Sequence, residues 1–249
     1  MTADGWARTV RHRLGVGRLL PLGAPGDGAW IAEEAAAAVL RHAAAGLPAV
    51  RLDVLRIALT DPEDAHDPVV PPPPSALPPG PLRITADFAA TTTEPLPTTA
   101  TLLRTTLATA ATELLGLTVT EVDLRVTELL DEEQESAEAG VSSAVRPADA
   151  PTAPQRPTDP GTPDEDRVAA AVLTVPGVTR LTSALGRRAV RLAEDRETEG
   201  ALPRRHAHVE FAVDVDRRAL DVAREVRTAV SESLPDHPAV TVLVTAVDH

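Results

Sequence analysis

The sequence predicts an α+β fold: two tandem α-β-β-α-β modules, each a three-stranded mixed sheet with two helices on one face. Three observations predict it. The same order of helix and strand patterns can be followed twice along the 249 residues. A proline-rich, acidic stretch separates the two copies, and Phe88 and Phe211 occupy corresponding strands. A right-handed strand-helix-strand crossover then makes the last two strands of each module parallel.

Composition sets the predicted boundaries. Residues 1–29 form a basic N-terminal segment, 30–130 the first module, 131–163 a linker and 164–249 the second module. The linker is acidic at its start and then rich in Pro, Ala, Thr and Ser, a composition with too little apolar content to fold. Inside the first module, residues 61–81 are an acidic and proline-rich insertion, which favours extended polyproline II structure.

The strands of the first module are predicted over residues 51–59, 82–89 and 119–127, each with apolar residues at period two. In the last of them, apolar positions alternate with charged ones. The first strand is expected to have Asp53, Leu55, Ile57 and Leu59 on one side, and the second is expected to direct Ile84, Ala86 and Phe88 toward the core.

The helices of the first module are an alanine-rich one over residues 30–45 and one that begins near Pro97. Proline suits the first turn of a helix because its missing N–H would be unpaired there. Gly116 is placed to end the second helix in a left-handed cap. The predicted buried stripe of this helix is Leu103, Leu107, Ala110 and Leu114.

The second module repeats this order. A helix is predicted over 164–173 and a strand over 178–182, which residues 189–192 could extend as a hairpin. A strand over 208–214 follows, with Val209, Phe211 and Val213 on one side. The module ends with a helix over 217–234 and a strand over 240–247. The expected stripe of the long helix is Leu220, Ala223, Val230 and Leu234, with Arg227 at its edge. The last strand is apolar on nearly every residue, which predicts burial on both faces or pairing with a partner.

These residues resemble the alkaline-shock-protein (envelope stress response) family. Leu82-Arg-Ile-Thr-Ala-Asp-Phe is followed by a helix that begins with proline, and then by Glu113-Leu-Leu-Gly-Leu-Thr-Val-Thr-Glu-Val-Asp-Leu-Arg-Val. The family has a Gly-Leu turn and an alternating strand at these places, and an opening helix similar to residues 30–40. The second module is similar over 168–178, 209–214 and 240–247, with Pro235-Asp-His-Pro in place of the turn. The resemblance implies a non-enzymatic protein linked to envelope stress, acting near the cytoplasmic membrane face through a partner anchor.

Composition excludes several classes of protein. The chain has no cysteine, hence no disulfide, thiolate metal site or cysteine nucleophile. A net charge of −13 and four aromatic residues argue against a nucleic-acid binder, which usually shows a basic footprint and stacking aromatics. Neither a signal peptide nor an apolar run of spanning length is visible, so the cytoplasm is the expected location, with peripheral attachment to the membrane as an option. Nucleophile and phosphate-loop motifs are also missing, so no catalytic residue and no cofactor are expected.

Two groups of residues are candidate sites. His206, His208 and Glu210 alternate along one strand face at a spacing that could chelate a metal, although a solvated strand face accounts for the same pattern. The N-terminal segment has a basic amphipathic character that could contact an anionic membrane or a partner, the alternative being docking on its own domain. Its residues are Trp6, Arg8, Val10, Arg11, Leu14 and Arg18.

The sequence therefore predicts a non-catalytic scaffold or interaction protein. We expect its sheet faces and strand edges to bind a protein partner, for which a membrane-anchored protein is a candidate, or a second copy of the chain. The alternative is a ligand- or metal-binding regulatory protein, or an enzyme with a pocket between the modules.

Overall fold

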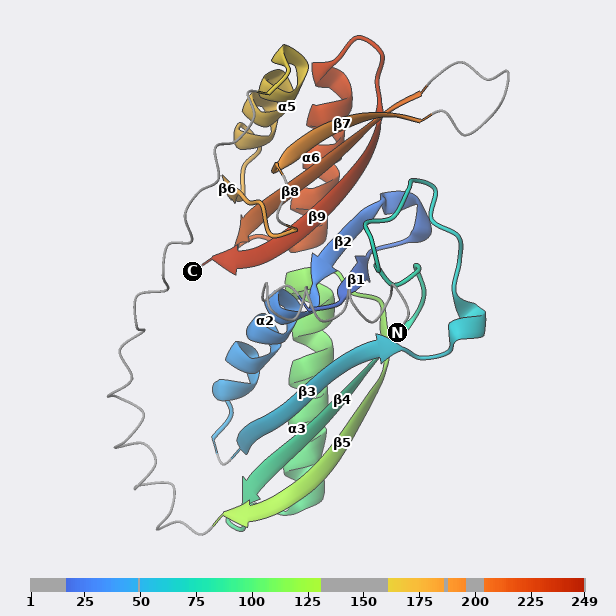
Figure 1. Cartoon of the computed structure of the whole chain (residues 1–249). Coiled ribbons are helices and arrows are strands. Elements are labelled where there is room, and N and C mark those ends of the chain that lie inside the picture. The colour runs from blue at the N-terminus through green and yellow to red at the C-terminus, as the bar shows by residue number, and fades with distance from the viewer. Residues whose placement is uncertain (1–16, 49, 131–160, 186–187, 196–203, 249) are drawn as a thin grey trace.

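The computed structural model describes residues 17–48, 50–130, 161–185, 188–195 and 204–248. The described chain is α+β, with a three-stranded and a six-stranded mixed sheet (Figure 1).

The three-stranded sheet has the order β3-β4-β5, with β3 (Val50–Leu59) antiparallel to β4 (Leu82–Thr91) and β4 parallel to β5 (Val119–Leu130). Helices α2 (Glu33–Ala45) and α3 (Leu96–Thr109) cover one face of it (Figure 1). These bounds agree with the predicted strands and with a helix that starts at Pro97. Gly116 has φ of +85°, so the predicted left-handed cap is confirmed.

The six-stranded sheet has the order β1-β2-β9-β8-β6, and β7 also pairs with β8. β6 and β7 are antiparallel to β8, whereas β9 is parallel to it. Two helices, α5 and α6, lie on one face (Figure 1). The bounds are α5 Pro163–Leu173, β6 Val178–Leu181, β7 Val190–Asp195, β8 Arg204–Asp214, α6 Ala219–Ser233 and β9 Ala239–Asp248.

Two strands before α2 were not predicted. β1 (Leu19–Leu22) and β2 (Ala29–Ala32) are antiparallel to one another, and β2 runs parallel to β9. The helix predicted from residue 30 therefore begins at Glu33, and Trp30 lies in a strand that extends the sheet of the C-terminal half. Local propensity could not reveal this, because the pairing partner is about two hundred residues away.

Two side chains do not lie on the sides predicted for them, Leu114 on its helix and Asp53 on its strand. Leu114 is 40% exposed, while Ala111 and Leu115 are buried, because residues Ala110–Leu115 form a π-helical turn. Its wider turn shifts the phase of the stripe. Asp53 is exposed because a β-bulge between Leu52 and Leu55 changes which side chains face the helices.

The predicted cores of the central strands are confirmed. Phe88 on β4 and Phe211 on β8 are fully buried. Val240 to Val244 of β9 are buried on both faces, because α6 packs on one face and the proline-rich insertion contacts Thr241 on the other. Cover on both faces thus explains the apolar last strand.

The two halves pack directly on each other at Gly116. Its carbonyl accepts a hydrogen bond from the Gly23 N–H (3.2 Å), and Thr112 O accepts one from Arg218 Nε (3.0 Å). A Cβ on Gly116 would lie 2.4 Å from Leu220 Cβ on α6. The turn that ends the α3 region therefore needs glycine both for its backbone conformation and for its neighbour.

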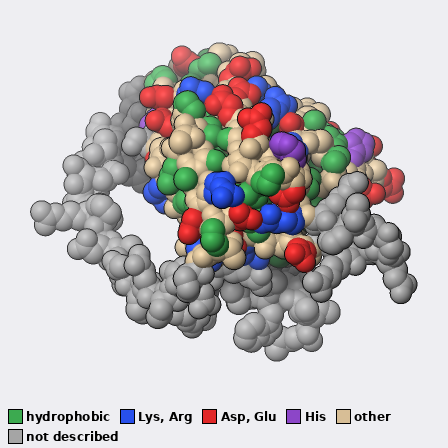
Figure 2. Space-filling model, turned by 90° about the horizontal axis from the view of Figure 1, so that it is seen from above, with side chains coloured by type: hydrophobic (Ala, Val, Ile, Leu, Met, Phe, Trp, Pro, Cys, Tyr) green, Lys and Arg blue, Asp and Glu red, His purple; other side chains and the backbone are tan. Residues whose placement is uncertain are grey.

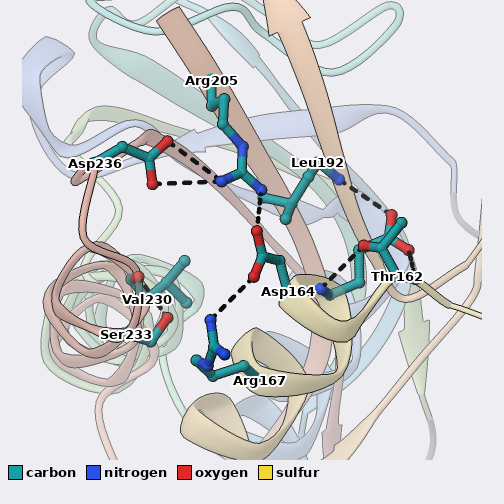
Figure 3. Close-up of polar contacts among 9 residues, drawn as sticks. Thr162, Asp164, Arg167, Leu192, Arg205, Val230, Ser233 and Asp236 are labelled. Atoms are coloured by element: carbon teal, nitrogen blue, oxygen red, sulfur yellow. Dashed lines mark hydrogen bonds and ion pairs between the residues drawn. The ribbon is translucent and has the colours of Figure 1, made fainter.

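Ion pairs tie the start of α5 to the rest of its sheet (Figure 3). Thr162 and Glu165 form a capping box, and Glu165 also accepts from the Leu192 N–H of β7 (3.3 Å). Asp164 pairs with Arg205 of β8 (2.8 Å), which also contacts Asp236 beyond α6 (3.4 Å). These contacts anchor the short helix α5 to β7 and β8.

Candidate functional site

The predicted polar row on β8 is buried, not solvated. His208 is 5% exposed and Glu210 is fully buried. The proline-rich insertion lies over this face: Pro71 O accepts from the Thr241 hydroxyl (2.9 Å), and Leu77 O accepts from Trp30 Nε1 (3.0 Å). The solvated-face alternative is therefore wrong for His208 and Glu210, which are both buried. The insertion reaches the neighbouring strands β9 and β2 on this face, and the loop between β6 and β7 contacts Glu210 through Leu185.

Within this row, His208 Nε2 lies 3.5 Å from Glu210 Oε1. The other Glu210 oxygen accepts from the Leu185 N–H (3.2 Å), whereas neither atom of the 3.5 Å contact has a hydrogen-bond partner in the described structure. His206 Nε2 is 2.7 Å from the Thr241 hydroxyl, which donates its own proton to Pro71. The imidazole of His206 thus contacts Thr241 of β9, whereas the imidazole of His208 lies beside Glu210.

A metal centre does not emerge from these residues. The described part of the chain contains no group of three His, Asp or Glu side chains arranged to hold a metal ion. The chelating spacing of His206, His208 and Glu210 along β8 is therefore not matched by a converging set of donors, since a zinc site needs three or four. What remains is a buried imidazole–carboxylate pair under a loop.

Arg18 is bound to its own chain. Its guanidinium pairs with Glu33 at 3.0 and 2.8 Å and donates to Ile57 O of β3 at 2.7 Å. Glu33 in turn accepts from the Ile57 N–H (3.4 Å). The two side chains thus cap the outer edge of β3. The other members of the N-terminal group lie outside the described residues: Trp6, Arg8, Val10, Arg11 and Leu14.

The ionisation of Glu33 reflects these contacts. Burial by itself raises the pKa of Glu33, but the hydrogen bonds and charge of Arg18, with the Ile57 N–H, hold the pKa below its ordinary value. The same contacts raise the pKa of Arg18. Both groups are therefore charged at neutral pH.

An open groove of about 620 Å³ lies beside the C-terminal half of α6 and the start of β9. Arg224 in its wall pairs with Asp27 at 2.8 and 3.0 Å, and Arg227 donates to Gly26 O at 2.8 Å. Burial lowers the pKa of Arg227, against the opposing charge of Asp27. The arginines thus hold the glycine-rich turn before β2, a link between halves that sequence spacing did not signal.

The face of the three-stranded sheet opposite its helices has exposed side chains at its centre and no covering element among the described residues. We call it the outer face. Its charges alternate in sign and pair across strands, as in Arg83 with Glu121 (2.6 Å) and Arg51 with Glu128 (2.7 Å). Unlike the buried row on β8, its central residues Arg56 and Thr85 are exposed. The outer face comprises Arg51, Asp53, Arg56, Arg83, Thr85, Asp87, Glu121, Asp123, Arg125 and Glu128.

The end of the molecule nearest the second sheet carries a mixed surface. Acidic, basic and apolar side chains are interspersed on it in Figure 2, without a continuous basic patch on that face. In the described residues, helices fall short of the length and apolar character required to cross a bilayer. Comparisons of the chain with protein-family models, curated proteins and solved structures found no match.

Proposed function

We propose that this chain is a non-catalytic interaction protein, built from two copies of one α-β-β-α-β module of the envelope stress response (alkaline shock) type. The observation that carries the proposal is the contrast between the open outer face of the first sheet and the covered face of the second.

Strand directions support the duplication. In the first sheet β3 is antiparallel and β5 parallel to the central β4. In the second, β6 and β7 are antiparallel and β9 is parallel to β8. β6 and β7 occupy the place of β3 as two pieces of one interrupted strand. The buried phenylalanines, Phe88 and Phe211, lie on the two central strands.

The covered face suggests how a partner binds the open one. A proline-rich segment lies against β9 and β2 on the face that carries the polar row of β8, and it accepts hydrogen bonds from Thr241 and Trp30. The outer face has no such cover from the described elements, and its alternating charges favour a polar partner segment of complementary pattern. A membrane-anchored partner would bring the chain to the membrane face, in line with the family resemblance.

Co-isolation in mild detergent from the organism that encodes the chain tests the proposal. Tagged wild-type chain should recover a membrane-fraction protein, and Arg56→Glu should lose it by about tenfold or more, because Arg56 lies at the centre of the outer face. Arg41→Glu on α2 is the matched control, since Arg41 is also exposed and the charge change is the same. Equal recovery by the two variants would contradict a role for the outer face.

Metal analysis separates this proposal from the metal-binding alternative. Purified chain and His208→Ala should both contain less than stoichiometric metal. A bound metal at one per chain that His208→Ala removes would favour a regulatory or catalytic metal protein instead.

A further inference from the structure

Three of the four sheet edges are already occupied or interrupted. At β1, Leu19 forms a parallel bridge with Ala76 and its carbonyl accepts from the Leu77 N–H (2.9 Å). At β3, Arg18 and Glu33 bind the backbone of Ile57. At the far side of β8, the edge is divided between the two short strands β6 and β7.

The fourth edge, on β5, is different. β5 has twelve residues, more than any other described strand, and borders the three-stranded sheet. Its apolar side chains are poorly covered, with Val126 39% and Leu129 52% exposed. A long, regular edge of this kind is a template for pairing with another strand.

Within the described residues, the centre of this edge pairs with no other strand and carries one side-chain contact. Arg104 of α3 donates a hydrogen bond from Nε to Val122 O (3.2 Å), so this carbonyl points away from β4. Because backbone groups alternate in direction along a strand, those of Leu124 and Val126 point the same way.

We propose that β5 pairs antiparallel with β5 of a second copy of the chain, with the two-fold axis at Leu124. The two three-stranded sheets then form one continuous six-stranded sheet. This deepens the proposed function, on which it rests, by identifying one partner as the chain itself.

Charge selects this register. In an antiparallel pair, residues directly opposite one another carry their side chains on the same face of the sheet. The two-fold axis must therefore pass through a residue of β5 and not between two residues. An axis at Asp123 opposes two aspartates, and an axis at Arg125 opposes two arginines. The axis at Leu124 places Asp123 opposite Arg125 of the second copy, twice.

The same register matches the apolar side. Val122 then faces Val126 of the second copy, again twice, which covers a valine that is exposed in the single chain. Opposite charges and β-branched pairs stabilise facing strands, whereas like charges destabilise them. In the dimer, Arg104 no longer binds Val122 O, and this carbonyl instead accepts a hydrogen bond from the N–H of Val126 in the second copy.

Analytical ultracentrifugation over a concentration series at physiological salt tests the pairing, since such salt screens the net charge of −13 beyond roughly 8 Å. Wild-type chain should dimerise. Asp123→Arg and Arg125→Asp should each raise the dissociation constant by about tenfold or more, because each opposes like charges twice.

Mixing provides the matched control. The two single variants carry complementary charges, so an equimolar mixture should form heterodimers. The double variant Asp123→Arg/Arg125→Asp should form homodimers but should not pair with wild type. Circular dichroism of each variant checks that it folds.

A wild-type chain that stays monomeric throughout the series overturns this inference, as does a single variant that dimerises normally. Arg56 lies on β3, away from this edge, so the co-isolation experiment gives its answer independently. Partner recovery that depends on Arg56, with monomeric wild type, leaves the proposed function standing and removes the β5 pairing alone.

Discussion

The two sheets share their strand directions but differ in what lies over the face opposite the helices. On the second sheet, Glu210 and Thr241 are fully buried, and Thr241 donates a hydrogen bond to the proline-rich insertion. On the first sheet, Arg56 and Thr85 at the centre of the same face are exposed. The difference teaches that a sheet with two helices on one face leaves its other face to be covered from elsewhere. In this chain, the first half supplies part of the cover for the second sheet.

The same contrast holds for the edges. The N-terminal strands β1 and β2 extend the second sheet beyond β9, so its central strands are enclosed. The first sheet ends at β5 without such an extension in the described chain. The open face and the open edge thus occur on the same sheet, where contacts with other molecules are expected.

Removing a contact between the second sheet and the proline-rich insertion should have the largest effect on stability. Trp30 is buried on the covered face and donates to Leu77 O. Trp30→Ala should lower the free energy of unfolding by about 3–5 kcal/mol, through lost burial and the cavity that remains. Urea unfolding followed by circular dichroism measures it. Thr85→Ala on the outer face, the control, should change stability by less than about 0.5 kcal/mol.

The buried pair on β8 should show strong coupling. His208→Leu leaves the Glu210 carboxylate buried without its imidazole neighbour, which should cost about 3 kcal/mol. Replacing both residues, in His208→Leu/Glu210→Met, removes the buried polar pair and should recover about 2 kcal/mol of that loss. A double variant as destabilised as the sum of the two single variants would show that the residues act independently.

The edge of β3 should respond to acid, with a smaller effect. The folded-state pKa of Glu33 lies below its ordinary value, so Glu33 stabilises the fold above the unfolded pKa of about 4.3, and this stabilisation is lost as pH falls below it. Glu33→Gln should cost about 1 kcal/mol at pH 7.

Urea unfolding at several pH values provides the check. Below about pH 4 the difference between wild type and Glu33→Gln should shrink, since protonated Glu33 no longer pairs with Arg18. A difference that is the same at pH 3 and pH 7 would mean that the charge of Glu33 does not stabilise the edge.

Much of the fold could be predicted from local patterns. Period-two alternation placed Ile84, Ala86 and Phe88 in the core, and Gly116 marked the end of a helix through its need for a left-handed conformation. Two of the wrong predictions involved phase. The π-helical turn exposed Leu114, and the bulge in β3 exposed Asp53, because one extra residue in a turn or strand changes which side chains face inward.

The candidate site could be predicted less well. The sequence placed His206, His208 and Glu210 on one strand face, but cover of that face depends on tertiary contacts. Residues 71–77 reach Thr241 and Trp30 from the other half, and Leu185 contacts Glu210. The pairing of Arg18 with Glu33 and of Arg224 with Asp27 also brings together side chains with no signal in their spacing.

By itself, then, the sequence determined the order, the type and most of the core of the elements from α2 onward, because these follow from periodicity and from the backbone preferences of glycine and proline. Tertiary structure alone decided that β1 and β2 form and which faces and edges are covered. β2 joins β9, and the proline-rich insertion crosses to β9 and β2, because burial between distant segments outweighs local propensity. The same physical reason leaves β5 and the outer face as the surfaces to test.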